Sequence, residues 1–366
     1  RDNPVEAVFG SERFPFAQKS NSAYGIHLKE TLFSGGRRKL SIQAAKQSAK
    51  ANEASSWASI RQAQLDALGA YLQVLRLRDQ TAVLKQRRLA VSAHRKVAQD
   101  LYDQGLVARN DLLETQVRER EIDDAVQELN DARISATQDL NRILGREIDA
   151  ALGVPDSLGP APRLDASCDG LIRSADEQNP HLQTLRTRLQ AARTRERLAH
   201  RDYWPEIYLS LGHSYEENRY MAYPHVNAVV AGMSWNLFEG GARKARITKA
   251  QAEIARDTQG LQDARRGVSV AVGTAWRQWK QSLREETTAQ DNVHAAQSNL
   301  QIVEDQYRSG LARSSDVLDA EVLLADSRYT VITKHYESYW NQARLLATAG
   351  EDPAEFYADV ARRGEH

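Results

Sequence analysis

Polar and apolar positions alternate in three short segments of the chain. In the segments 24–32, 207–211 and 226–237, every second residue from Tyr24, Ile207 and Val229 onward is apolar, with one exception. The apolar positions are Tyr24, Ile26, Leu28, Leu32, Ile207, Leu209, Leu211, Val229, Ala231, Met233, Trp235 and Leu237. A period of two residues predicts β-strands that have one apolar and one polar face. Glu30 is the exception, and we place it near the rim of its sheet.

Two much longer segments show no such alternation. Residues 37–101 and 242–306 contain no proline and are rich in Ala, Gln, Arg, Lys, Leu and Glu, which are good helix formers. A helix over either segment would be about 100 Å long at 1.5 Å per residue. Their apolar positions are sparse and often small, so we predict long helices that pack along a narrow seam, as in a coiled coil or a helical wall.

The sequence contains an internal repeat of one unit. The octapeptide LFSGGRRK at 32–39 returns 205 residues later as LFEGGARK at 237–244. The same spacing relates 102–106 to 307–311, 111–113 to 316–318, and 144–145 to 349–350. Landmarks that keep one spacing without insertion indicate a duplicated, domain-sized unit. We assign 1–145 to copy one, 146–178 to a connector, 179–350 to copy two and 351–366 to a C-terminal tail.

Each copy is predicted to form a helical hairpin with a sharp turn after its long helix. The turns fall at 104–106 and 309–311, where Gly105 and Gly310 can adopt the left-handed conformation that ends a helix. Return helices are expected over 111–144 and 316–349. Their expected capping and first-turn residues are Asn110, Ser314 or Ser315, Asp111 and Asp316.

The segments outside these hairpins are less regular. Asn179-Pro180 opens a predicted helix over 181–201, whose counterpart in copy one would precede Arg1. Pro4 and Pro15 indicate a loop within 1–21. Residues 153–168 are rich in Pro, Gly and Ser, and therefore predict an irregular surface connector.

Composition narrows the classes of function. The 49 Lys and Arg residues balance 49 Asp and Glu residues, so the chain lacks the basic excess of a nucleic-acid binder, and we expect no nucleic-acid partner. Apolar residues make up only 41%, and the mean hydropathy of −0.60 suits long, wetted helices. No apolar run is long enough for a membrane-spanning helix. Membrane crossing would therefore need β-strands of about 10 residues.

Residues that could carry chemistry are few and scattered. Cys168 is the single cysteine, which excludes an internal disulfide and a multi-thiolate metal site. We interpret His213 and His225 as surface residues, and Trp276 and Trp279 as helix-packing residues. The chain has no phosphate-binding loop, nucleophile elbow or Cys–His pair, so we expect neither an enzyme nor a cofactor.

In this order, the landmarks resemble those of the TolC family of outer-membrane efflux proteins. The resemblance covers nearly the whole chain. It rests on the duplicated Leu-Phe-x-Gly-Gly at 32–36 and 237–241, on Asn179-Pro180 and Trp204-Pro205, and on the tip sequence at 307–311 followed by DVLDA at 316–320. The glycines that mark the two strand-to-helix junctions are Gly35, Gly36, Gly240 and Gly241.

The resemblance implies a mixed α and β fold. Long antiparallel helical hairpins would form the wall of a periplasmic tunnel, and strands from a homotrimer would share a twelve-stranded transmembrane β-barrel. It implies a location in the outer membrane of a Gram-negative bacterium, in contact with lipid. The implied partners are a periplasmic adaptor (membrane fusion) protein and an inner-membrane transporter of the resistance-nodulation-division or ABC type. The implied function is the exit duct of a tripartite efflux pump or type I secretion system, gated at its helical tip.

Carboxylates gather just after each turn. Asp316 and Asp319 share one helix face at a spacing of three residues, and Asp111 and Glu114 repeat this arrangement. Three protomers would bring these groups to one axis and form a cation-biased constriction that titrates with pH. Helix capping and solvated charge explain the spacing as well, and the resemblance is what favours a gate role for Asp316 and Asp319.

The resemblance assigns further residues at the tip. Tyr307 falls on a family gate position, and Tyr102 is its copy-one equivalent. Ala312 stands where the family has an arginine, and Arg313 follows it, so we include Arg313 in the candidate gate. The residues Gly105, Leu106, Gly310 and Leu311 are either simple hairpin turns or the tips that dock the adaptor.

Two other functions remain open from the residues alone. A soluble coiled-coil scaffold would explain the helices, although it leaves the alternating strands unexplained. A stand-alone porin would explain the strands, although it does not account for helices of this length. The sequence does not distinguish between a drug, a metal ion and a protein as cargo.

Overall fold

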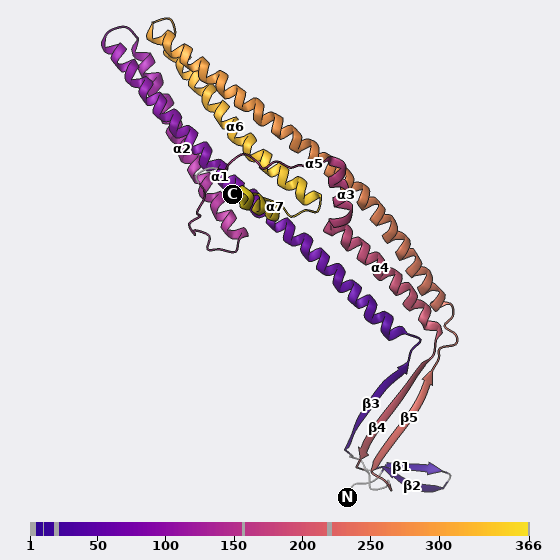
Figure 1. The fold of residues 1–366 in the computed structure, drawn as a ribbon. Coiled ribbons are helices and arrows are strands. Elements are labelled where there is room, and N and C mark those ends of the chain that lie inside the picture. The colour runs from indigo at the N-terminus through magenta and orange to yellow at the C-terminus, as the bar shows by residue number, and fades with distance from the viewer. Residues whose placement is uncertain (1–4, 10, 18–21, 156–157, 218–221, 365–366) are drawn as a thin grey trace. The chain divides into compact units, whose positions relative to one another are not determined.

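The computed structural model describes residues 5–9, 11–17, 22–155, 158–217 and 222–364 (Figure 1). Its elements are β1 (Val5–Phe9), β2 (Glu12–Ala17), β3 (Ala23–Phe33), α1 (Arg37–Asp103), α2 (Arg109–Ile143), α3 (Cys168–Gln178), α4 (Pro180–His200), η1 (Arg201–Tyr203), β4 (Glu206–Glu216), β5 (His225–Ser234), α5 (Ala242–Arg308), α6 (Ser314–Thr348) and α7 (Pro353–Gly364). The chain divides into two compact units, which we call the strand unit (1–52 and 185–261) and the tip unit (53–184 and 262–366).

The predicted long helices are present, and the sequence repeat governs where they begin and end. Helices α1 and α5 each contain 67 residues, and α2 and α6 each contain 35. Each of these helices begins and ends 205 residues from its counterpart, as Arg37 and Ala242 illustrate. Among the described residues, none of the helices is sufficiently long and apolar to cross a membrane.

Both hairpin turns end their first helix in the same way. Gly105 has a φ of 74° and Gly310 a φ of 71°, as predicted from the need for a left-handed residue. The N–H of Leu311 donates to the carbonyl of Gln306 at 2.8 Å, and the first turn has the equivalent bond. This closure satisfies a carbonyl that the helix end would otherwise leave unpaired, so each glycine fixes the point where the chain reverses.

The predicted caps of the return helices are wrong. The N-cap residues are Ala108 and Arg313, while Asn110, Ser314 and Ser315 already lie inside the first helical turn. The short turns bring the chain into helical geometry earlier than the capping pattern indicated. Asp316 takes a different role from the one expected of Ser314, because its Oδ2 accepts a hydrogen bond from the backbone N–H of Arg313 at 2.8 Å.

The strand unit contains an antiparallel sheet in the order β3-β4-β5. Its register aligns Leu28 with Leu211 and Leu211 with Val229, so the apolar positions of the three strands share one face. The opposite face carries polar and small residues on β3 and β4, such as Lys29 and Ser210, and also the exposed Val226 and Val230 of β5. Leu28, Leu211 and Val229 are all exposed to the surroundings of the single chain, and the sheet therefore has an apolar face that nothing in the described strand unit covers.

Two expectations about the strands need correction. Strand β5 ends at Ser234 rather than at Leu237, although Trp235 and Leu237 continue the exposed apolar surface. Residues 1–21 were predicted to be a loop, but β1 and β2 pair as an antiparallel ribbon in which Pro15 lies opposite Glu6. A two-stranded ribbon tolerates proline because each strand leaves its outer edge unpaired. Pro4 lies outside the described residues.

The connector contains a helix that the Pro, Gly and Ser pattern did not predict. Helix α3 is capped by Ser167, whose Oγ accepts from the N–H of Gly170 at 3.0 Å. It buries Leu171 and Ala175 against residues of α5 and α6, which include Trp279. The interpretation of Trp279 as a packing residue is therefore confirmed. The irregular part of the connector is held by α6, where the Tyr339 hydroxyl donates to the carbonyl of Gly159 at 2.7 Å.

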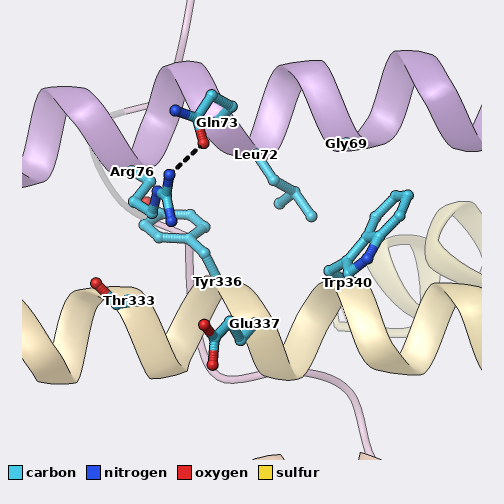
Figure 2. Close-up of a pocket in the computed structure, with 8 residues that line it drawn as sticks. All are labelled: Gly69, Leu72, Gln73, Arg76, Thr333, Tyr336, Glu337 and Trp340. Atoms are coloured by element: carbon cyan, nitrogen blue, oxygen red, sulfur yellow. Dashed lines mark hydrogen bonds between the residues drawn. The ribbon is translucent and has the colours of Figure 1, made fainter. Parts of the chain in front are cut away.

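Helices α1 and α6 meet along a seam in the tip unit (Figure 2). Trp340 of α6 points toward Gly69 of α1, and a Cβ added at Gly69 would lie 3.0 Å from the indole ring. Leu72 and Leu75 pack against aromatic rings of α6, and the Tyr336 hydroxyl donates to Asp79 at 2.6 Å. Glycine in a helix interior costs about 1 kcal/mol relative to alanine. At position 69 it provides the space that Trp340 occupies.

Replacement of Gly69 by valine is expected to destabilise the tip unit. The added side chain would overlap the Trp340 ring, and overpacking of this kind costs about 1–3 kcal/mol. Thermal unfolding followed by circular dichroism would measure the effect as a lower Tm. Gly267→Val is the matched control, because a Cβ at Gly267 meets nothing within 4 Å. Equal Tm values for the two variants would contradict this account of the seam.

Candidate functional site

The two hairpin turns lie where α1 meets α2 and where α5 meets α6 (Figure 1), and each carries an exposed leucine. Leu106 is 68% exposed and Leu311 is 80% exposed. A Cβ at Gly105 or Gly310 would meet nothing within 4 Å, so the positive φ alone explains glycine at these positions. The residues predicted to dock an adaptor thus lie at the chain reversals, with their leucines open to solvent.

The two tyrosines of the candidate gate differ in environment. Tyr102 is 37% exposed, whereas Tyr307 is only 5% exposed. Burial raises the pKa of Tyr307, and the negative charge of Asp111 raises it further, while the nearby Ser314 hydroxyl acts in the opposite direction. The structure therefore brings together Tyr307 and Asp111 from different hairpins.

His94 of α1 completes this group of residues. Its Nε2 lies 2.8 Å from the Oγ of the fully buried Ser314, and its ring centroid lies 4.9 Å from that of Tyr307. Burial lowers the pKa of His94, and Asp111 opposes this effect more weakly. We call His94, Asp111, Tyr307 and Ser314 the tip cluster. No sequence motif singled out His94, and the equivalent position of the other copy holds Asn299.

The other candidate gate carboxylates occupy varied surroundings. Asp316 and Asp319 are exposed, and Glu114 is half-buried. The pKa of Arg118 is raised chiefly by its hydrogen bond to Glu121 at 3.0 Å, and also by the charges of Glu114 and Asp319. Glu114 of α2 and Asp319 of α6 therefore lie within the electrostatic reach of one guanidinium. Arg118 therefore partly balances, within each chain, the negative charge that Glu114 and Asp319 would contribute to the predicted ring of carboxylates.

Moving along the helices from the tip cluster away from the turns, one meets first an apolar layer and then a polar cleft. Val91, Ile122 and Leu318 form a buried group that joins α1, α2 and α6. Beyond them is a cleft of about 300 Å³ between α1, α5 and α6, to which Glu304 and Glu321 contribute. The seam between the hairpins thus alternates apolar and titratable layers.

Glu321 is an unusual residue for such a seam because it is only 6% exposed. Burial raises its pKa, the charge of Glu304 raises it further, and Arg87 and Arg328 oppose the shift. Sequence reasoning missed Glu321, since a single glutamate on a helix rich in charge gives no signal of burial. Among the described residues, the structure has no group of three or more His, Cys, Asp or Glu side chains that could hold a metal ion.

The glycine pairs at the strand-to-helix junctions lie in the strand unit. All of them have positive φ, from 57° at Gly240 to 88° at Gly241. A Cβ at Gly35 would also lie 2.5 Å from Cβ of Trp204, so this residue must be glycine for two reasons. Close by, Arg246 forms ion pairs with Asp202 at 3.0 Å and with Glu239 at 2.6 Å. The junction glycines therefore have a structural role, which is to turn the strands into the long helices.

Comparison with known proteins decides the family. The family model described as outer membrane efflux protein matches residues 6–146 and 171–351, which is most of the chain. The chain belongs to the outer membrane efflux protein family. The family match confirms the resemblance to TolC-type proteins, and it makes this chain an outer-membrane channel protein of the efflux and secretion class.

Individual relatives agree with this family. Protein CyaE of Bordetella pertussis is 26% identical over 90% of this chain and 71% of its own length. The alkaline protease secretion protein AprF of Pseudomonas aeruginosa is 25% identical over 77% of this chain and 60% of its own length. The outer membrane protein VceC of Vibrio cholerae, a solved structure, has a TM-score of 0.79 at 16% identity and covers 96% of this chain and 85% of its own. This likeness confirms the fold of long helices with a small sheet.

Replacement of Glu321 by glutamine is expected to raise the Tm by a few degrees at pH 8 and to have little effect at pH 4. A carboxyl group whose pKa is raised by folding makes the native state lose stability as pH rises, and the neutral amide removes this loss. Thermal unfolding at several pH values would measure the difference. The control is Asp326→Asn at an exposed position of α6. A benefit that does not grow with pH would contradict the assignment.

Proposed function

We propose that the protein acts as a homotrimer that forms the exit duct of a tripartite efflux pump or a type I secretion system. The observation that carries this proposal is the uncovered apolar face of the β3-β4-β5 sheet, which lies opposite a more polar face. A sheet of this kind fits a barrel wall between lipid outside and water inside.

The edges of the sheet support sharing of the barrel between protomers. Strands β3 and β5 each have one neighbouring strand in the described sheet, so each leaves one edge unpaired. Unpaired backbone groups are costly in lipid, and closure with strands of other protomers would satisfy them. The sheet would supply three of the four strands that a twelve-stranded barrel requires from each protomer of a trimer.

The tip unit provides the proposed gate. The tip cluster joins the two hairpins of one protomer, and Asp316 and Asp319 remain exposed beside it. Around a threefold axis, these carboxylates would form a constriction that favours cations. Opening would part the hairpins, and it requires that a partner bind the open arrangement better than the closed one.

The partners follow from the family and from the exposed tips. A periplasmic adaptor would bind Leu106 and Leu311, and an inner-membrane transporter of the resistance-nodulation-division or ABC type would supply the energy. Exposed apolar side chains at the ends of rigid hairpins are suitable contacts for another helical protein. In this proposal the protomer carries out no chemical reaction and offers a conduit only.

Single-channel recording in a planar bilayer with symmetrical salt tests the conduit. We expect small, flickering, cation-selective steps, because a gated tip narrows the tunnel. Large and steady steps would instead support an open porin. A protein that is soluble without detergent and never inserts would support a coiled-coil scaffold and overturn the proposal.

The double variant Asp316→Ala and Asp319→Ala is expected to reduce cation selectivity severalfold, since it removes exposed negative charges from the proposed constriction. Reversal potentials in a salt gradient would measure the selectivity. Asp326→Ala, at another exposed position of α6, serves as the control. Unchanged selectivity and conductance in the double variant would exclude a gate role for the two carboxylates.

The double variant Leu106→Asp and Leu311→Asp is expected to abolish pull-down of the adaptor, because it places charges where apolar contacts are proposed. The fold should persist, since both side chains are exposed. Leu144→Asp, at the exposed far end of α2, is the control. Normal recovery of the adaptor with the double variant would argue against the docking role of the tips.

A further inference from the structure

A titratable side chain joins the two hairpins at the tip. His94 belongs to α1 of the first hairpin, whereas its hydrogen-bond partner Ser314 begins α6 of the second. Its ring contact, Tyr307, lies on the last turn of α5. A single imidazole therefore contacts both helices of the opposite hairpin, one through a hydrogen bond and the other through a ring contact.

The surroundings of His94 favour an uncharged ring. Ser314 is fully buried and Tyr307 nearly so, and Val91, one turn away on α1, is also fully buried. The hydroxyl of Ser314 can donate to the neutral ring or accept from it, so the contact suits the neutral imidazole in either tautomer. Burial removes part of the hydration that a charged ring needs, and the carboxylate of Asp111 offsets this cost only in part.

Only some of the helices packed around His94 place a charged side chain near its ring. From α2, Asp111 is the carboxylate that favours the protonated ring. From α5 the facing titratable group is Tyr307, which is uncharged near neutral pH because a tyrosine pKa is ordinarily about 10 and burial raises it further here. From α6 the direct contact is the uncharged Ser314, while Asp316 and Asp319 are exposed. On α1 itself, Arg95 is paired with Glu119 at 3.3 Å.

We propose that His94 is a proton-operated latch, which holds the two hairpin tips together while neutral and releases them when protonated. This inference rests on the proposed function of the tip as a gate, and it adds a means of regulation by periplasmic pH. The latch requires the juxtaposition of His94, Tyr307 and Ser314 on three different helices.

The sign of the pH effect follows from burial. In the latched state the pKa of His94 is lowered, so the latched state binds fewer protons than a state in which the ring is hydrated. Acidification below the ordinary histidine pKa of about 6.5 therefore favours the parted tips. In the range between the lowered pKa and the ordinary one, each fall of one pH unit changes the balance by up to about tenfold per protomer.

The repeat adds a distinction between the two copies. The copy-two position equivalent to His94 is Asn299, and the copy-one position equivalent to Ser314 is Arg109. An asparagine does not titrate, and Tyr102, the counterpart of Tyr307, is exposed. Proton control is consequently a property of one contact between hairpins, and the duplication does not generate a second latch.

The test is a distance measurement that does not require channel activity. Spin labels are placed at Leu106→Cys and Leu311→Cys in the full-length protein with Cys168→Ser. The labelled chain is co-expressed with an excess of cysteine-free chain, so that a trimer contains at most one labelled protomer. Pulsed electron paramagnetic resonance then gives the distance distribution between the tips. We expect the distribution to shift to longer distances between pH 8 and pH 5, and His94→Gln to keep the pH 8 distribution at both values.

Control variants separate the latch from a structural effect. His294→Gln, at an exposed position of α5, should respond to acid as the unmodified chain does. Ser314→Ala should broaden the distribution already at pH 8, because it removes the hydrogen bond and leaves the fold. An acid response retained in His94→Gln, no response in the unmodified chain, or a Ser314→Ala distribution identical to the unmodified one would each overturn the latch. A clear acid response in a protein that never conducts in bilayers would instead leave the latch standing and refute the proposed duct.

Discussion

The contact between α1 and α6 is the interaction on which the tip unit depends. Long helices with few apolar residues gain little stability alone, so their stability comes from packing against one another. Here Trp340 fits against Gly69, and Tyr336 reaches Asp79 across the seam. The same helix α6 also holds the connector, because Tyr339 and Gln342 donate to its carbonyls. Loss of the seam would release the hairpins and the connector together.

The seam changes character toward the turns. Near Trp340 it is aromatic and borders a pocket of about 310 Å³ between the two helices (Figure 2), whereas farther along it includes the buried carboxyl group of Glu321 and the imidazole of His94. Buried titratable groups weaken a contact in a way that depends on their protonation, and two alternative arrangements can then differ by little free energy. A seam that is aromatic at one end and sensitive to protonation at the other is suited to a tunnel that opens only at its tip.

Regular features of the fold could be predicted because they depend on local chemistry. The absence of proline over 37–101 and 242–306 and the glycine at each turn were sufficient to place the long helices and their reversals. The strands followed from alternation, although β5 ends earlier than its apolar pattern. Local rules failed where several interactions compete. The caps lie at Ala108 and Arg313, and at the second turn the Asp316 carboxylate accepts a hydrogen bond from the N–H of Arg313. Helix α3 forms at the end of the connector, just after its Pro-, Gly- and Ser-rich part.

The sequence by itself determined the duplication, the family and the positions of the turns, because these depend on residue identity and spacing along the chain. It also located Tyr307 and Asp111, which the structure brings together, but gave no indication of His94 or Glu321. Those two residues acquire their properties from burial, and burial arises only when helices that are distant in sequence meet. The apolar face of the sheet was encoded in each strand, whereas its alignment across β3, β4 and β5 was decided by their register in the tertiary structure.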